Sequence, residues 1–365
     1  MKNVGLVTWY RGTNYGSTLQ AYATRIALER LSARVRFVRS FERPFNLHNT
    51  RVNLFSRLRI RRVSPLATCR FPAERQAFAS FLKQQFPEVL PVSSCGYRRM
   101  LSSTDLFLCG SDQIWNCRHG FNPFLFLDFA GSARKASYSS SIGTGDVPSE
   151  YREQVKKLLK DFTHIGVREE STRKALAEVT GREDICTVLD PVFLLTAKDW
   201  TELLEAQHTT AAPSKPYVFC YFVGKASLHA EHLAKIKEAT GLEDALLLPS
   251  NDTPLETLSG ATRVESAGPM EFLRLLSGAS AVLTDSFHGS ALSIVFGRQF
   301  FNVKRFSDSD PASQNSRLYD LCKLFSIGNR FLEDGMPGAI DYTAVGARLE
   351  DLRAQSISFL KELLR

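Results

Sequence analysis

The stretch richest in groups that could do chemistry is Ala281–Ser293, where a buried strand is predicted to pass through a polar turn into an apolar helix. A helix N-terminus presents free backbone N–H groups, and Gly289 allows a phosphate or carboxylate to approach them closely. We therefore expect Ser286, Gly289 and Ser290 to bind an anion. His288 would stand beside that anion, where an imidazole is suited to proton transfer near neutral pH. The alternative is that Ser286 caps the helix and His288 is an ordinary surface histidine.

Basic side chains follow two other predicted strands. Arg168 stands where a strand ends and a helix begins. Its guanidinium can bind a carboxylate or phosphate through two hydrogen bonds, or it can pair with a nearby acid and support the fold. Lys304 and Arg305 directly follow the predicted strand Phe300–Val303. If the strands are neighbours, both cations lie at the same sheet edge as His288; otherwise they are two solvated charges.

Two polar loops of the N-terminal half have the composition of a sugar-binding site. In Gly110–Asn116, one aromatic plane stands among hydroxyl, carboxylate and amide groups that could match a sugar ring and its hydroxyls, with ordinary turn chemistry as the alternative. The other loop follows the first predicted strand and lacks the GxGxxG spacing of a dinucleotide site. The candidate residues of the two loops are Asn14, Tyr15, Gln20, Ser111, Asp112, Gln113, Trp115 and Asn116.

Short apolar runs alternate with helical patterns along most of the chain, which predicts an α/β fold with parallel sheets covered by helices on both faces. We expect a Rossmann-like domain over residues 1–190, a second over 191–341, and a closing helix over 342–365. A hinge is expected near Asp190-Pro191, because proline ends regular pairing. The predicted strands are Val4–Trp9, Arg34–Val38, Asp105–Cys109, Arg134–Ile142, Thr187–Leu189, Pro216–Val223, Ala245–Leu248, Ala281–Thr284 and Phe300–Val303.

Composition limits the class of protein further. The 365 residues carry a net charge of +8, and the segment Arg34–Arg75 holds eleven arginines against two glutamates. This segment suits phosphates or anionic lipid head groups, with a solvated loop as the alternative, and no motif points to nucleic acid. Seven cysteines without a CxxC pair predict free thiols and no metal site. Because no apolar stretch is long enough to span a bilayer, we expect a cytoplasmic protein that contacts the membrane peripherally through the basic segment.

Five of these pieces occur in a particular order along the chain. They are Asn14-Tyr15-Gly16 with Gln20, Gly110–Asn116, Gly166–Glu170, Leu189-Asp190-Pro191 and Asp285–Gly289, with Asn315–Leu318 following near the end. The ordered set resembles the polysaccharide pyruvyl transferase family. The resemblance implies a GT-B-like fold, in which two Rossmann-like domains face a cleft. It also implies phosphoenolpyruvate as donor and a hexose of a surface polysaccharide precursor as acceptor. From the basic segment Arg34–Arg75 we further expect a lipid-diphosphate-linked acceptor at the membrane.

The same resemblance implies roles for individual residues. His288, Arg168 and Lys304 correspond to the donor-site residues that carry the reaction, and Arg305 and Arg317 to further donor ligands. The donor side is then the C-terminal domain and the acceptor side the N-terminal domain. No cofactor is implied beyond phosphoenolpyruvate as co-substrate. Two alternatives remain: a GT-B glycosyltransferase that uses a nucleotide sugar, and a glycan-binding protein of the same fold without turnover.

Overall fold

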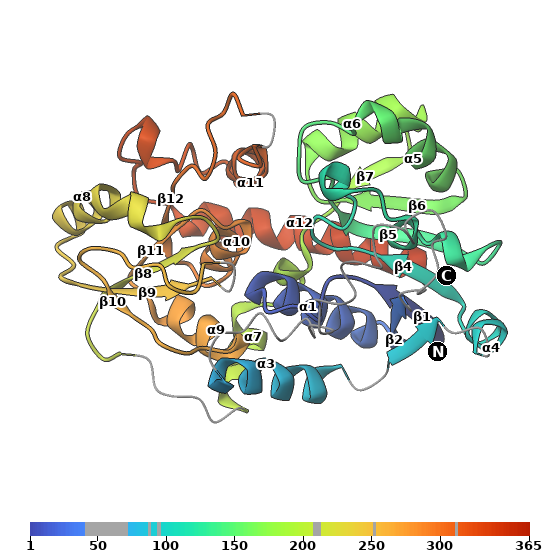
Figure 1. Ribbon diagram of the computed structural model, residues 1–365, viewed down its shortest axis with the longest axis horizontal. Helices are drawn as coiled ribbons and strands as arrows, with labels where there is room; N and C mark the ends of the chain where they lie inside the picture. The colour runs from blue at the N-terminus through green and yellow to red at the C-terminus, as the bar shows by residue number, and fades with distance from the viewer. Residues whose placement is uncertain (41–71, 87–88, 93–95, 207–212, 251–252, 311–312) are drawn as a thin grey trace, which may run out of the picture.

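The chain forms two parallel β-sheets, one in each half (Figure 1). The computed structural model describes residues 1–40, 72–86, 89–92, 96–206, 213–250, 253–310 and 313–365. The first sheet has seven strands in the order β3-β2-β1-β4-β5-β6-β7. Its strands are β1 Lys2–Val7, β2 Ala33–Ser40, β3 Val89–Val92, β4 Leu106–Cys109, β5 Lys135–Ser140, β6 Phe162–Val167 and β7 Ile185–Thr187.

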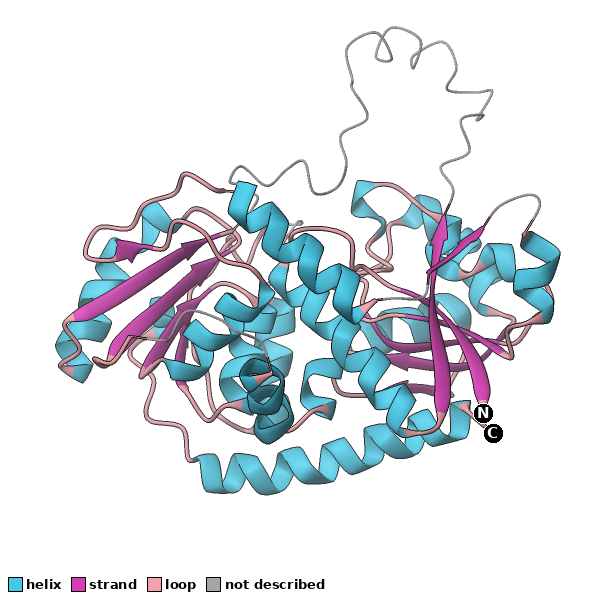
Figure 2. Ribbon diagram, turned by 90° about the horizontal axis from the view of Figure 1, so that it is seen from below, coloured by secondary structure: helices cyan, strands magenta, loops and turns pink. Residues whose placement is uncertain are grey.

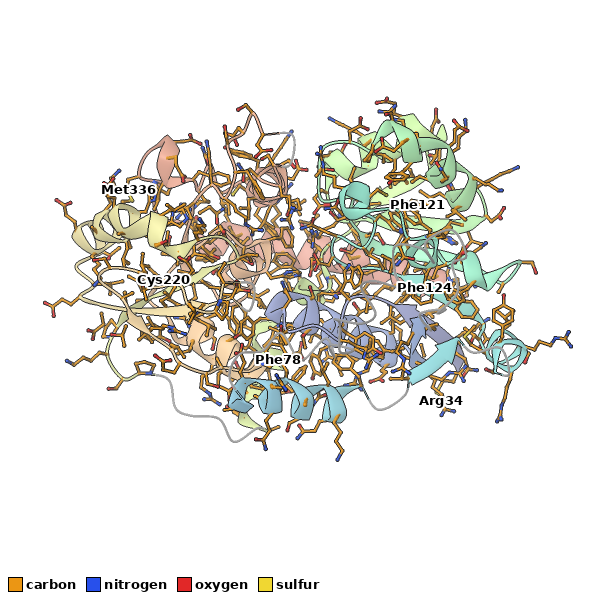
Figure 3. The ribbon with its side chains drawn as sticks, viewed as in Figure 1. Arg34, Phe78, Phe121, Phe124, Cys220 and Met336 are labelled. Atoms are coloured by element: carbon orange, nitrogen blue, oxygen red, sulfur yellow. The ribbon has the colours of Figure 1, made fainter. Side chains whose placement is uncertain are left out.

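The second sheet has five strands in the order β10-β9-β8-β11-β12. Its strands are β8 Tyr217–Phe222, β9 Asp244–Pro249, β10 Thr262–Arg263, β11 Ala281–Thr284 and β12 Gln299–Asn302. The central strands β8 and β11 are buried at every residue, as expected for a parallel sheet covered on both faces. Cys220 of β8 marks this interior in Figure 3.

Helices cover both sheets and fill the space between them. They are α1 Tyr15–Arg30, α3 Pro72–Gln85, α4 Tyr97–Ser102, α5 Arg152–Leu159, α6 Glu170–Thr180, α7 Ala197–Glu205, α8 Ala230–Thr240, α9 Pro269–Gly278, α10 Phe287–Val295, α11 Ser316–Phe325 and α12 Tyr342–Leu363. The two halves meet through aromatic packing. Tyr15 of α1 stacks on Phe272 of α9 with ring centroids 4.9 Å apart. Phe78 of α3, labelled in Figure 3, packs on the same tyrosine at 5.2 Å.

The last helix ties the two halves together. Figure 2 shows α12 running along one side of both sheets to the C-terminus. Near its end, Ser356 Oγ accepts a hydrogen bond from the backbone N–H of Leu189, 3.0 Å away. Phe359 packs so closely on Gly166 of β6 that a Cβ there would lie 2.8 Å from the ring. The C-terminal helix is therefore anchored on the first sheet, although it begins beside the second.

The strand order determines where a ligand can bind. It reverses at β1 in the first sheet and at β8 in the second, because the chain continues to strands on either side of each. Ligands of open α/β sheets bind outside the carboxyl ends of the strands at such points. The segments that leave these ends include those after β1, β4, β6 and β11, which contain the motifs singled out from the sequence.

Several sequence predictions can be compared directly with this architecture. The α/β class and all nine predicted strands are confirmed, apart from shifts of a few residues at their ends. The sequence missed β3, most of β6 and the two-residue β10, which are short or lie beside more strongly patterned segments. Cys109, Cys117, Cys186, Cys220 and Cys322 are free thiols.

Other predictions fall on parts of the chain that are not described. Most of the basic segment, residues 41–71, lies outside the described residues, as do Cys69 and Cys95. Of the described helices, none is long and apolar enough to cross a membrane. The described residues also contain no group of three or more His, Cys, Asp or Glu side chains that could hold a metal ion.

Candidate active site

A buried arginine at the carboxyl end of the first sheet is the centre of the site. Arg168 directly follows β6, and its side chain is 2% exposed. Its Nη1 lies 3.1 Å from Asp190 Oδ2 and 3.5 Å from Asp112 Oδ1. Its Nε donates a 2.6 Å hydrogen bond to Glu169 Oε1. Three carboxylates from three segments therefore converge on one guanidinium, which compensates for the cost of burying its charge.

The second sheet contributes an imidazole to this cluster. His288 is the second residue of α10, directly after the turn that leaves β11, and it is 6% exposed. Its Nε2 lies 3.4 Å from Asp190 Oδ2 and makes no directed hydrogen bond within the described part of the chain. The ring packs on Gly16 of α1, where a Cβ would lie 2.3 Å from Nδ1. Three motifs far apart in the sequence thus meet around one histidine.

The charges of this cluster reinforce one another. Burial alone would raise the pKa of Asp190, but His288 and Arg168 outweigh it and hold that pKa well below its usual range. The same two side chains, with a hydrogen bond from Ser17, lower the pKa of Asp112 against the effect of burial. Burial would lower the pKa of Arg168, but the surrounding carboxylates raise it. Both aspartates are therefore ionised at neutral pH, and Arg168 is charged.

A second buried arginine forms no ion pair with the described residues. Arg317 lies in the first turn of α11 and is 7% exposed. Its Nη2 donates a 2.8 Å hydrogen bond to Gln314, while its Nε has no partner, and no carboxylate among the described residues forms an ion pair with it. Burial first, and then the charge of Arg168, lower the pKa of Arg317 to about 9. At neutral pH this is a buried cation that an anionic ligand would stabilise.

The two arginines line a cavity of about 390 Å³ between the halves of the molecule. Asp190 lines it too, as does Phe287, whose ring centroid lies 4.0 Å from the guanidinium carbon of Arg168. The walls come from α6, α11 and α12. The other lining residues are Glu169, Glu170, Ser171, Lys174, Thr187, Leu189, Phe193, Asp320, Leu321, Lys323, Leu324 and Arg348.

The predicted anion-binding turn at α10 is largely occupied by its own hydrogen bonds. Ser286 is the N-cap of α10, and its Oγ accepts a hydrogen bond from the N–H of Gly289 at 3.3 Å. Ser290 Oγ donates to Asn302 Oδ1 at 2.7 Å. A Cβ on Gly289 would lie 2.6 Å from Thr284 Oγ1, so this glycine allows helix and strand to pack closely. The role of these residues toward an anion stays a prediction.

The two cations after β12 do not join the cluster. Lys304 Nζ lies 2.7 Å from Asp308 Oδ2 and 3.1 Å from Asp334 Oδ1, and the hydrogen bond from Lys304 to Asp308 is the main cause of its raised pKa. Arg305 binds Asp285, with its Nε 3.0 Å from Oδ2. Both cations follow the strand expected from the sequence, but the aspartates determine where their side chains point.

The loop after β1 forms structural contacts with both halves. Asn14 caps α1 by accepting a hydrogen bond from the N–H of Ser17. The hydroxyl of Tyr15 donates to the carbonyl oxygen of Ala267, on the second half, at 3.1 Å. Gln20 accepts a 3.3 Å hydrogen bond from the N–H of Ser111 and so connects the two candidate acceptor loops.

The loop after β4 reaches the cluster directly. Ser111 Oγ lies 3.1 Å from Asp190 Oδ2, and Asp112 Oδ2 accepts a 2.6 Å hydrogen bond from Ser17. Gln113 lies 2.8 Å from Gln314, the partner of Arg317, and Asn116 donates to Gln113 at 2.8 Å. This loop therefore contacts α1 through Gln20 and also contacts the hydrogen-bond partners of the two arginines.

The prediction that Trp115 offers a stacking surface to a sugar is wrong. Its side chain is 1% exposed, and its ring stacks on Phe126 with centroids 5.4 Å apart. Its indole N–H donates to the carbonyl oxygen of Leu125 at 3.1 Å. Trp115 belongs to the core, where a large aromatic ring with a satisfied N–H is common.

Sequence reasoning assigned no role to several residues that the structure brings into the site. Asp190 joins Arg168 and His288, and the Leu-Asp-Pro motif directly after a strand was a signal for it. Gly16 packs against the imidazole of His288. The Asn14-Tyr15-Gly16 motif drew attention to this glycine but did not indicate the contact. Nothing in the sequence pattern distinguished Lys174 or Lys323 from ordinary surface lysines.

Two Rossmann-like halves with a site between them define a GT-B-like protein, and the fold is similar to that of solved structures. UDP-GlcNAc 2-epimerase from Methanocaldococcus jannaschii has a TM-score of 0.51 at 13% identity, over 96% of this chain and 92% of that one. A putative UDP-N-acetylglucosamine 2-epimerase from Listeria monocytogenes has a TM-score of 0.49 at 12% identity, over 99% and 90% of the two chains. At such identities the likeness concerns the fold alone, and it confirms the predicted GT-B-like fold.

The sequence itself identifies the family. The family model of polysaccharide pyruvyl transferase matches residues 14–305, which include all five ordered motifs. The chain therefore belongs to the polysaccharide pyruvyl transferase family, as the motifs predicted. No protein of curated function matches it.

Proposed function

We propose that this protein transfers pyruvate from phosphoenolpyruvate to two hydroxyls of a hexose in a surface polysaccharide precursor. The product is a cyclic ketal, and inorganic phosphate is released. One observation carries the proposal: His288 Nε2 lies 3.4 Å from Asp190, and Asp190 lines one cavity together with Arg168 and Arg317, which forms no ion pair with the described residues. Membership of the family supports a transferase acting on a polysaccharide.

The donor fits the charges of the cavity. Phosphoenolpyruvate carries a carboxylate and a phosphate on one carbon, and guanidinium groups bind both through paired hydrogen bonds. Arg317 would gain the anionic partner it lacks, while Arg168 keeps its carboxylates and presents the Nη2 that is unpartnered within the described residues. Binding would therefore remove the cost of a buried, uncompensated cation.

The reaction needs one proton at carbon and two new C–O bonds. Protonation of the methylene group turns it into the methyl of the product and leaves an oxocarbenium-like centre at C2. One sugar hydroxyl oxygen adds there, and the second displaces the phosphate with cleavage of its C–O bond. Of the two hydroxyl protons, one replaces the proton delivered to carbon and the other leaves on phosphate or solvent.

In this proposal, His288 delivers the proton to carbon. Its Nε2 makes no directed hydrogen bond in the described residues and lies 3.4 Å from Oδ2 of the ionised Asp190. Arg168 Nη1 donates a 3.1 Å hydrogen bond to the same oxygen of Asp190. The acceptor would reach this centre along the loop after β4, where Asp112 faces Arg168 and can accept a hydrogen bond from a sugar hydroxyl.

Calorimetry with phosphoenolpyruvate and with nucleotide sugars tests this proposal on the wild type and two variants. His288→Ala should retain phosphoenolpyruvate binding and lose about 10²–10⁴-fold in turnover, the usual contribution of a general acid. Arg168→Lys should weaken both binding and turnover, because lysine keeps the charge but loses the planar fork. Tight binding of a nucleotide sugar, with no response to phosphoenolpyruvate, would instead favour a glycosyltransferase. Phosphoenolpyruvate binding without phosphate release on any acceptor would favour a glycan-binding protein.

A further inference from the structure

Three exposed cations surround the outer part of the cavity. Lys174 belongs to α6, Lys323 to α11 and Arg348 to α12, and all three line the same space as the buried arginines. They come from segments more than 20 residues apart, so only the fold brings them together. Figure 1 shows that α6 and α11 face each other from opposite halves of the molecule.

The carboxylates that line the cavity form their ion pairs and hydrogen bonds with residues other than these outer cations, within the described part of the chain. Glu170 binds Arg173, with 2.6 Å between Oε1 and Nη2, and it also accepts a hydrogen bond from Thr187. Asp320 accepts two hydrogen bonds from Ser171 across the cavity, from the backbone N–H at 3.2 Å and from Oγ at 2.7 Å.

The two inner carboxylates are likewise bound to a residue other than these three cations. Glu169 and Asp190 are bound to Arg168. In the part of the chain that the structure describes, no ion pair is formed by Lys174, Lys323 or Arg348. The cavity therefore has a buried arginine floor and an exposed cationic rim.

We propose that this rim, Lys174, Lys323 and Arg348, binds the phosphate group of the donor, while Arg317 on the floor binds its carboxylate. The inference rests on the proposed function and assigns the two ends of its donor. A carboxylate is planar and matches the fork of a guanidinium, whereas ammonium groups bind phosphate as point charges from several directions. Phosphate is also the group that leaves, and the rim is the part of the cavity in contact with solvent.

This orientation explains how the site could select a phosphorylated donor. Pyruvate has a carboxylate for Arg317 on the floor but no phosphate for the rim, so it should bind less tightly than phosphoenolpyruvate. Inorganic phosphate satisfies the rim alone and should compete with phosphoenolpyruvate as a product inhibitor. Lys174 and Lys323 would thus determine specificity for the leaving group, without taking part in proton transfer.

The test is calorimetry with inorganic phosphate and with pyruvate as separate probes, each on the wild type and three variants. The double variant Lys174→Gln/Lys323→Gln should bind phosphate about 10-fold more weakly, as expected for two exposed charges, and bind pyruvate as the wild type does. Arg317→Gln should show the reverse pattern. A matched control, Lys235→Gln/Lys361→Gln, removes two exposed lysines from α8 and α12 that do not line the cavity. It should bind both probes as the wild type does.

The outcomes separate this inference from the proposed function. Phosphate binding that is unchanged in the Lys174→Gln/Lys323→Gln variant overturns the inference, as does an equal loss of phosphate and pyruvate binding in that variant. If the wild type binds neither phosphoenolpyruvate nor phosphate, the proposed function itself fails. Phosphoenolpyruvate kinetics give an independent readout: the lysine variant should raise the KM and the inhibition constant of phosphate together, while kcat changes little.

Discussion

Replacing Gly16 by alanine should displace the imidazole that the proposed reaction depends on. An alanine Cβ would lie 2.3 Å from His288 Nδ1 and 2.4 Å from its Cγ. Non-bonded heavy atoms prefer about 3.5–4.0 Å, so the ring or the start of α1 must move by more than about 1 Å. A misplacement of this size commonly costs about 10²-fold in rate. Overpacking costs about 1–3 kcal/mol, offset by up to about 1 kcal/mol because alanine favours the helix.

The assay compares kcat, KM for phosphoenolpyruvate and thermal stability in Gly16→Ala and a matched control. Gly346→Ala makes the same substitution inside α12, where no described atom outside the backbone of that helix and the two chain neighbours lies within 4 Å of the added Cβ. The control should be as active as the wild type and more stable by up to about 1 kcal/mol. Gly16→Ala should lose about 10²-fold in kcat, with a smaller change in KM because Arg317 is not moved.

One result would refute the reasoning about Gly16. If Gly16→Ala keeps both the activity and the pH profile of the wild type, the position of His288 does not depend on its contact with α1. A loss of activity that follows unfolding alone would show that Gly16 matters for packing and not for the imidazole. Circular dichroism at the assay temperature separates the two results.

Three further predictions concern stability as well as activity. Arg317→Gln should leave the melting temperature of the ligand-free protein unchanged or higher, because it removes an uncompensated buried cation, while calorimetry shows weaker phosphoenolpyruvate binding. Trp115→Ala should cost about 3–5 kcal/mol in urea unfolding, whereas Trp115→Phe should keep the acceptor KM, because the ring lies in the core. The hydrogen bond from Arg30 lowers the pKa of Asp199 from 3.8 to about 2. Ionised Asp199 therefore stabilises the fold above about pH 4, and this stabilisation is lost as the pH falls toward 2. Asp199→Asn should therefore destabilise by about 1–2 kcal/mol at pH 7, and the difference should shrink in urea unfolding at pH 3.

The sequence predicted the elements of the site better than the directions of its side chains. His288 and Arg168 were found because a strand end followed by a helix start is a local pattern. Trp115 was misplaced because its loop composition suits a sugar, whereas its burial depends on Phe126 and the surrounding core. The direction of Lys304 likewise depends on Asp334, which is 30 residues away in the sequence.

The cavity could not be predicted from sequence patterns, for a related reason. Its rim joins Lys174, Lys323 and Arg348, each of which is an exposed cation on its own helix. Only the approach of α6, α11 and α12 makes them one site. That Arg317 forms no ion pair with the described residues is also a property of the folded chain, since Asp308, Asp310 and Asp320 lie close to it in the sequence.

The most direct test of the central claim measures phosphate release and acceptor mass in the same reaction. The protein is incubated with phosphoenolpyruvate and a panel of free and lipid-diphosphate-linked oligosaccharides. We predict that one acceptor gains a single pyruvyl ketal, that one phosphate is released per ketal formed, and that His288→Ala abolishes both signals together. Transfer of a sugar from a nucleotide donor to the same acceptors, with no phosphate released from phosphoenolpyruvate, would contradict the account.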